Sequence, residues 1–144
     1  MEAKEQGAVT RVAFAVRGHV EIQGVLSDFG GDGMEPISDE YMRQMTSKTK
    51  PYAIVILRAG PNSSRPGNEG TIWEHGRRNF VLRAGGVLPI VCPIRDGSDV
   101  RGIGIMSVSI DKAREVMDDD PGVKAGVFVY EVHEGRSFPG DCLP

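Results

Sequence analysis

One histidine and one aspartate have the residue types and settings that suit proton transfer. His75 is expected on a helix, on the same side as Asn79. Imidazole is the side chain whose ordinary pKa lies closest to neutral pH, so it can take up and release a proton there. Asp120 precedes Pro121, which pushes it out of helical geometry and can aim its carboxylate at a fixed place such as an imidazole. A carboxylate that orients a histidine makes a workable acid/base pair.

Each member of this pair also has a plainer interpretation. A histidine on a helix is often a solvated or capped surface side chain. The run Asp118–Asp120 can be a solvated patch of charge at the end of a helix, where acids oppose the helix dipole. The other two histidines, His19 and His133, are expected to be surface imidazoles. Spacing alone leaves both interpretations of His75 and Asp120 open.

The sequence carries no motif for a cofactor or a metal. His75 has no histidine or acid four residues later, and the chain contains no CxxC, HExxH or phosphate-binding loop. The segment Gly102-Ile103-Gly104 lacks the continuation of a nucleotide-binding loop. Cys92 and Cys142 are expected to be free thiols. We therefore expect chemistry without a cofactor and without a metal.

Charge and hydropathy exclude several classes of function. The formal net charge is −3, and the 17 Lys and Arg residues are scattered without the clusters that follow a phosphate backbone. No apolar run approaches the roughly 20 residues of a membrane-spanning helix. The segment Met1–Gln6 lacks the apolar core of a signal peptide. We expect a cytoplasmic protein that binds neither nucleic acid nor a membrane.

The elements that must position the pair begin near residue 51. Runs of apolar residues predict strands over 52–57, 87–91, 103–110 and 127–132, and helical spacing predicts helices over 71–84 and 112–117. Ser109 is expected to cap the second of these helices. The resulting order, β-α-β-β-α-β, is that of an α+β, ferredoxin-like domain with one antiparallel sheet and both helices on one face. The chain's 19 Gly and 9 Pro fit many short elements joined by turns.

The first 50 residues are expected to form an N-terminal extension to a domain over 51–144, which ends in a Pro/Gly-containing tail. Alternating apolar residues predict a β-hairpin over 9–29, and Ser38 is expected to cap a short helix. The sheet face opposite the helices would be apolar, and a second subunit or the hairpin must cover it. We favour a homodimer, because a bare apolar face would be a large exposed patch.

The stretch from Tyr52 to Glu131 resembles the YciI-like, or YCII-related, family. No single motif is specific, and the resemblance lies in the order of several. These are the strand 52–57, the helix carrying Glu74-His75, the segment Gly86–Pro89, the turn at Cys92-Pro93, the pair Asp120-Pro121 and the glycine-bounded segment 122–127. The match covers about 80 of the 144 residues. The N-terminal extension and Gly102, which follows Arg101 where some relatives carry a serine, depart from the family pattern.

The resemblance implies a ferredoxin-like dimer of the α/β-barrel type, in which His75 and Asp120 form the active-site pair. Arg58 and Arg101 stand at predicted strand ends near the cleft, where they could hold an anionic or phenolic ligand; for each, a surface position is the plainer interpretation.

The expected function is that of a small, cofactor-independent enzyme of the lyase or isomerase type. His75 would move a proton and Asp120 would orient it, in an isomerisation or elimination on a small organic substrate, with aromatic and phenolic compounds included. The alternative is a non-catalytic module of the same fold that binds a small molecule or serves another protein.

Overall fold

The computed structural model describes residues 36–143. The chain divides into two units, Met1–Ile37 and Ser38–Pro144. The division into an N-terminal extension over 1–50 and a domain over 51–144 stays a prediction. The hairpin predicted over 9–29 lies outside the described residues. The elements of the second unit are α2 (Asp39–Ser47), β1 (Lys50–Ala59), α3 (Glu69–Ala84), β2 (Ile90–Pro93), β3 (Val100–Met106), α4 (Ile110–Asp118), α5 (Pro121–Lys124) and β4 (Phe128–Ser137).

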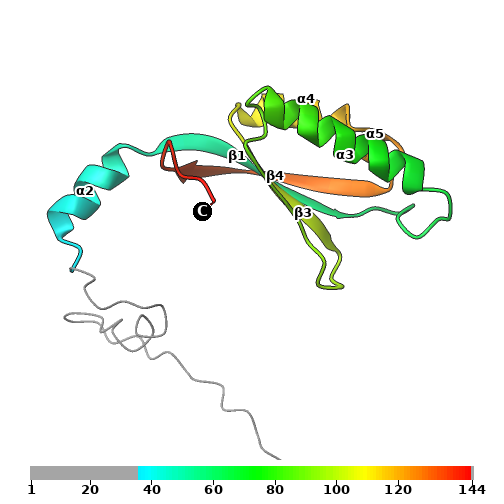
Figure 1. The fold of residues 1–144 in the computed structure, drawn as a ribbon, viewed down its shortest axis with the longest axis horizontal. Coiled ribbons are helices and arrows are strands. Elements are labelled where there is room, and N and C mark those ends of the chain that lie inside the picture. The colour runs from blue at the N-terminus through cyan, green and yellow to red at the C-terminus, as the bar shows by residue number, and fades with distance from the viewer. Residues whose placement is uncertain (1–35, 144) are drawn as a thin grey trace, which may run out of the picture. The chain divides into compact units, whose positions relative to one another are not determined.

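The four strands form one antiparallel sheet in the order β2-β3-β1-β4. β1 is central, because it pairs with β3 on one side and with β4 on the other. The helices α3, α4 and α5 lie together on one side of this sheet (Figure 1). This α+β arrangement confirms the predicted ferredoxin-like fold from β1 onward.

The alternation of side chains along β1 divides the sheet into two faces. Ala53, Val55 and Leu57 are buried and belong to the core, together with Ala113 and Met117 of α4. The opposite face carries the half-buried Ile54 and Ile56 of β1. Their neighbours on this open sheet face include Ile103 of β3, which is 39% exposed, and Val129 of β4, which is 44% exposed.

Two predicted helix caps are confirmed. The Ser38 hydroxyl accepts a hydrogen bond from the Tyr41 backbone N–H at 3.1 Å, and that of Ser109 accepts one from the Lys112 N–H at 3.2 Å. Because Ser109 starts α4, Ile110 is the first residue of this helix and does not extend the preceding strand, which ends at Met106.

β2 begins at Ile90, three residues later than predicted, because the end of α3 uses the intervening backbone. Gly86 adopts a left-handed φ of 72°, and its N–H donates to the Arg83 carbonyl. The Val87 N–H donates to the Leu82 carbonyl. These two bonds make a Schellman motif, so Val87 belongs to a helix terminus.

Candidate active site

Asp120 caps the short helix α5 and does not extend the acidic end of α4. α4 ends at Asp118, and Asp120 has an extended backbone with Pro121 after it as the first helical residue. Its Oδ1 accepts hydrogen bonds from the backbone N–H groups of Gly122, at 2.8 Å, and Val123, at 3.2 Å. Asp120 is completely buried. The plainer interpretation of a solvated acid therefore does not hold for this residue.

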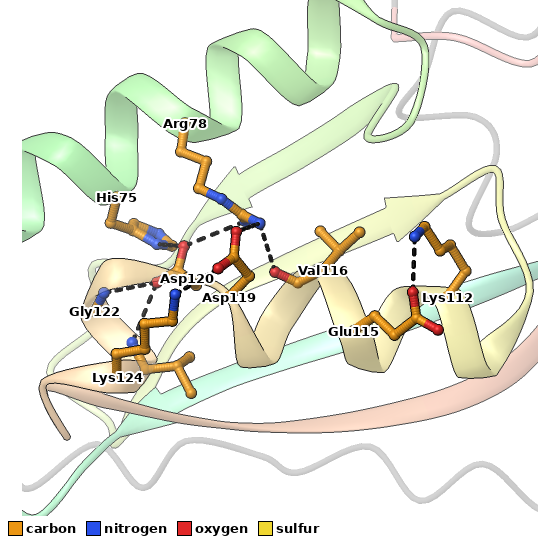
Figure 2. A network of polar contacts seen from close by, with 10 residues as sticks. His75, Arg78, Lys112, Glu115, Val116, Asp119, Asp120, Gly122 and Lys124 are labelled. Atoms are coloured by element: carbon orange, nitrogen blue, oxygen red, sulfur yellow. Dashed lines mark hydrogen bonds and ion pairs between the residues drawn. The ribbon is translucent and has the colours of Figure 1, made fainter.

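The other carboxylate oxygen of Asp120 meets His75. His75 Nδ1 lies 2.8 Å from Asp120 Oδ2, and the imidazole side chain is 13% exposed. Figure 2 shows His75 reaching from α3 toward Asp120, which stands at the start of α5. The imidazole also packs at a tilt of 55° against the Phe128 ring, with the ring centres 4.8 Å apart. The structure thus brings together the two residues that the sequence singled out for proton transfer.

The surroundings keep Asp120 ionised. Burial opposes the charge, but the hydrogen bond from His75, the charge of His75 and the N–H groups of Val123 and Gly122 together hold the pKa of Asp120 below its ordinary value. An ionised carboxylate only accepts hydrogen bonds, so the proton between the two groups belongs to His75 Nδ1. In the neutral imidazole, Nε2 then carries the lone pair and is the basic atom.

Asn79 contacts that basic atom. It lies one helical turn after His75, and its Nδ2 is 3.0 Å from His75 Nε2. An amide N–H donating to Nε2 agrees with a proton on Nδ1. Helical spacing places Asn79 on the same side of the helix as His75, but its residue type alone suggests no role. The spacing of four residues was the signal that could have found it.

Arg78 ties α3 to the region around Asp120. Its Nη2 donates to the Val116 carbonyl at 2.8 Å and to Asp119 Oδ2 at 3.4 Å, and its Nη1 lies 3.8 Å from Asp120 Oδ2 (Figure 2). Among the described residues, the buried Nη1 has no hydrogen-bond partner. Its charge therefore favours the ionised form of Asp120 without a direct hydrogen bond.

His75 and Asn79 line a cavity of about 560 Å³ between α3 and the helix-facing side of the sheet. That volume falls in the range of small-molecule sites. Most of the wall is apolar. The side chains with a polar group are His75, Asn79, Ser63, Arg95 and Arg101, and the apolar ones include Val55, Leu57, Ile72, Leu88, Val91, Met106, Met117, Val127 and Phe128.

The two arginines expected to hold a ligand are placed differently. Arg101 lines the cavity, and its Nη1 donates to the Ser98 carbonyl at 3.0 Å. Arg58 follows the inward-facing Leu57 and so lies on the open sheet face. Its guanidinium binds Glu131 at 2.5 Å and Asp99 at 3.1 Å, and it is not among the residues that line the cavity. Arg58 therefore lies away from the cavity, whereas Arg95, for which the sequence offers no signal, lines it.

Residues 36–143 contain no cluster of three or more His, Cys, Asp and Glu placed to hold a metal ion. Within the same range, no helix is long and apolar enough to cross a bilayer. Cys92 and Cys142 are free thiols, as expected.

Comparisons with known proteins show no family for this chain. No family model matches the chain, and no curated protein matches it. Among solved structures, the chain is similar to a 5-chloro-2-hydroxyhydroquinone dehydrochlorinase from Burkholderia phenoliruptrix, in complex with 2,5-dihydroxybenzoquinone. The identity is 20%, the TM-score is 0.38, and the match covers 61% of this chain and 95% of that one.

Proposed function

We propose that this protein is a cofactor-independent enzyme that moves a proton on a small organic substrate, with His75 as the acid/base group. The observation that carries the proposal is the hydrogen-bonded series Asp120–His75–Asn79, which begins at a fully buried carboxylate and ends in the wall of an apolar cavity. A buried carboxylate that fixes the tautomer of an imidazole is the arrangement that general-base catalysis requires.

The proposed step begins with a substrate C–H next to a carbonyl group. Nε2 of His75 takes the proton, the C–H electron pair passes into the adjacent carbonyl, and an enolate forms beside an imidazolium. Asp120 stabilises that imidazolium through Nδ1–H. In an isomerisation the imidazolium returns the proton to a different carbon. In an elimination the enolate instead expels a leaving group as its anion, and the imidazolium then gives up the proton to that anion or to water.

Asn79 must yield Nε2 to the substrate in this scheme. Its amide N–H can donate to the neutral imidazole, but it cannot accept the proton of the imidazolium unless the amide turns its oxygen inward. Asn79 therefore holds the free base in its reactive tautomer and moves aside, or rotates, when the proton is transferred.

The test is exchange of acidic C–H hydrogens for deuterium, followed by NMR in D₂O over a panel of small aryl and cyclic ketones. His75→Ala should lower the rate of exchange on an accepted compound by about 10²- to 10⁴-fold. His133→Ala is the matched control, because that imidazole is exposed and pairs only with Glu131 among the described residues. If His75→Ala stays within threefold of the wild type, the proposed chemistry is wrong.

A binding module is the second candidate, and the contact of Asn79 with Nε2 favours it. A basic atom that already accepts a hydrogen bond is satisfied without a substrate. Ligands of such a module would occupy the same cavity and leave unchanged. Prolonged binding of a compound with no exchange and no conversion would favour this candidate over the enzyme.

We also propose that a second copy of the chain covers the open sheet face. The isoleucine and valine side chains of this face include Ile54, Ile56, Ile103, Ile105 and Val129. Ile103→Lys would place a charge in the interface and should shift the protein from dimer to monomer in analytical ultracentrifugation. Phe80→Lys, at a 70% exposed residue of α3, should leave the dimer intact. A monomeric wild type would contradict the proposal.

A further inference from the structure

The cavity has a second polar region besides His75 and Asn79. Arg95 and Arg101 both line it, and both belong to the hairpin that joins β2 to β3. Each of the two arginines is largely exposed, whereas Val55, Leu57 and Met106 of the same wall are buried. The arginines therefore stand at the solvent end of the cavity, and its deeper wall is apolar.

The hairpin holds the two arginines on opposite arms. Pro93 pairs with Gly102, and the Ile94 N–H donates to the Arg101 carbonyl at 3.0 Å. Beyond this bond the chain turns through Gly97, whose φ of 82° suits glycine. Arg95 is the residue after Ile94, and Arg101 accepts the hydrogen bond from Ile94 through its backbone carbonyl. The fold therefore brings two cations to one end of the cavity.

These cations lack carboxylate partners in the part of the chain that the structure describes. Arg95 makes no side-chain hydrogen bond or ion pair there, and Arg101 donates only to a backbone carbonyl. The acids of the hairpin have other contacts. Asp99 binds Arg58, and Asp96 accepts from the Ser98 N–H. The charge of Arg101 acts on Asp96 only as the smallest of the causes that lower the pKa of this acid, after the hydrogen bonds from Ser98, and the two side chains form no ion pair. Two guanidinium groups without an ion pair at the end of an apolar cavity remain available to an anion.

We propose that Arg95 and Arg101 form a carboxylate-binding subsite, so that the substrate is a small organic anion with an apolar body. A guanidinium donates two parallel N–H bonds to the two oxygens of a carboxylate, a geometry that a neutral amide cannot reproduce. The apolar body would lie against the wall between the arginines and α3, with its acidic C–H toward His75. This last placement rests on the proposed function, whereas the subsite itself does not.

The experiment measures binding of phenylacetate and of its neutral isostere phenylacetamide by NMR titration. The wild type should bind the anion at least about tenfold more tightly, as expected for charge-assisted hydrogen bonds. The double variant Arg95→Gln/Arg101→Gln should reduce that preference to within twofold. The matched control is Arg43→Gln/Arg114→Gln, which removes two exposed helical arginines that do not line the cavity, and it should keep the wild-type preference.

Equal affinities for the anion and the amide, undetectable binding of the anion, or a preference that survives in the Arg95/Arg101 variant would each overturn the subsite. All four arginines are exposed, and circular dichroism checks that both double variants fold as the wild type does. The result for His75→Ala separates this proposal from the proposed function. A kept preference for phenylacetate in that variant, with no loss of C–H exchange, would refute the enzyme and leave the subsite standing. Loss of C–H exchange in His75→Ala, together with no preference of the wild type for phenylacetate, would support the enzyme and refute the subsite.

Discussion

Asp120→Asn should convert His75 into the tautomer that cannot act as the base. The asparagine is nearly isosteric, and its carbonyl oxygen can keep the two cap bonds from Gly122 and Val123. Its NH₂ group then takes the place of Oδ2, 2.8 Å from His75 Nδ1. Two donors cannot face each other at that distance, so the imidazole proton must move to Nε2. There it also meets the donating amide of Asn79, unless that amide rotates.

The size of the effect follows from this loss of the basic atom. A histidine with its proton on Nε2 has no lone pair toward the cavity, so the general-base contribution of about 10²- to 10⁴-fold should disappear. The cap bonds survive in the variant, so the lost stability is that of one charge-assisted hydrogen bond, about 1.5–3 kcal/mol. Activity should therefore fall far more than the population of folded protein.

Two measurements check this reasoning. Imidazole ¹⁵N shifts should report a proton on Nδ1 of His75 in the wild type and on Nε2 in Asp120→Asn, and deuterium exchange should fall by at least about a hundredfold. Asp119→Asn is the control, because that acid belongs to the same run but is 67% exposed. An Nε2 proton in the wild type, or an exchange rate in Asp120→Asn within threefold of the wild type, would refute the assignment.

Three further predictions concern the same region. The pKa of Asp120 is depressed in the folded protein, so its ionisation stabilises the fold above the ordinary carboxyl pKa of about 3.9. This contribution is lost as the pH falls through the folded-state value, so chemical denaturation should show a wild-type advantage over Asp120→Asn that shrinks below about pH 4; an advantage unchanged from about pH 4 down to about pH 2 would contradict it. Gly122→Ala should lower the free energy of unfolding by about 1–3 kcal/mol, because the new Cβ would lie 2.4 Å from a Phe128 ring carbon. Gly70→Ala is the control and should cost nothing, because no atom lies within 4 Å of its new Cβ; equal stabilities of the two variants would refute this packing argument. Asn79→Leu should lower the apparent KM for exchange by about fivefold, since the substrate no longer displaces an amide N–H from Nε2, and a raised KM would show that Asn79 binds the substrate instead.

The order of the elements was predictable because their signals are local. The apolar run of β1, the hydroxyl caps Ser38 and Ser109 and the glycines after α3 each act within a few residues. The boundaries were less predictable where one segment serves two purposes. Val87 looks like strand from its composition, but its N–H completes the end of α3.

The two members of the site were predictable as residue types. Their pairing was implied only by the family resemblance, because spacing along the chain left it open. Pro121 takes Asp120 out of helical geometry, yet the acids around Asp120 fit a solvated helix end just as well. The complete burial of Asp120 rules out the solvated helix end. This burial results from α3 and Phe128 packing over α5. Arg58 lies away from the cavity for a similar reason, because the face of the sheet on which a strand residue lies depends on its position in the alternation relative to the core residues.

By itself, the sequence determined the βαββαβ order of the elements, the caps that begin α2 and α4, and the identity of the residues able to move a proton. These depend on propensities and spacing within a few residues. Only the tertiary structure decided that His75 and Asp120 meet, that Asn79 occupies Nε2, and that Arg95 and Arg101 share the cavity while Arg58 does not. Such contacts join segments from different elements, and packing of the helices on the sheet sets their distances, which no local pattern encodes.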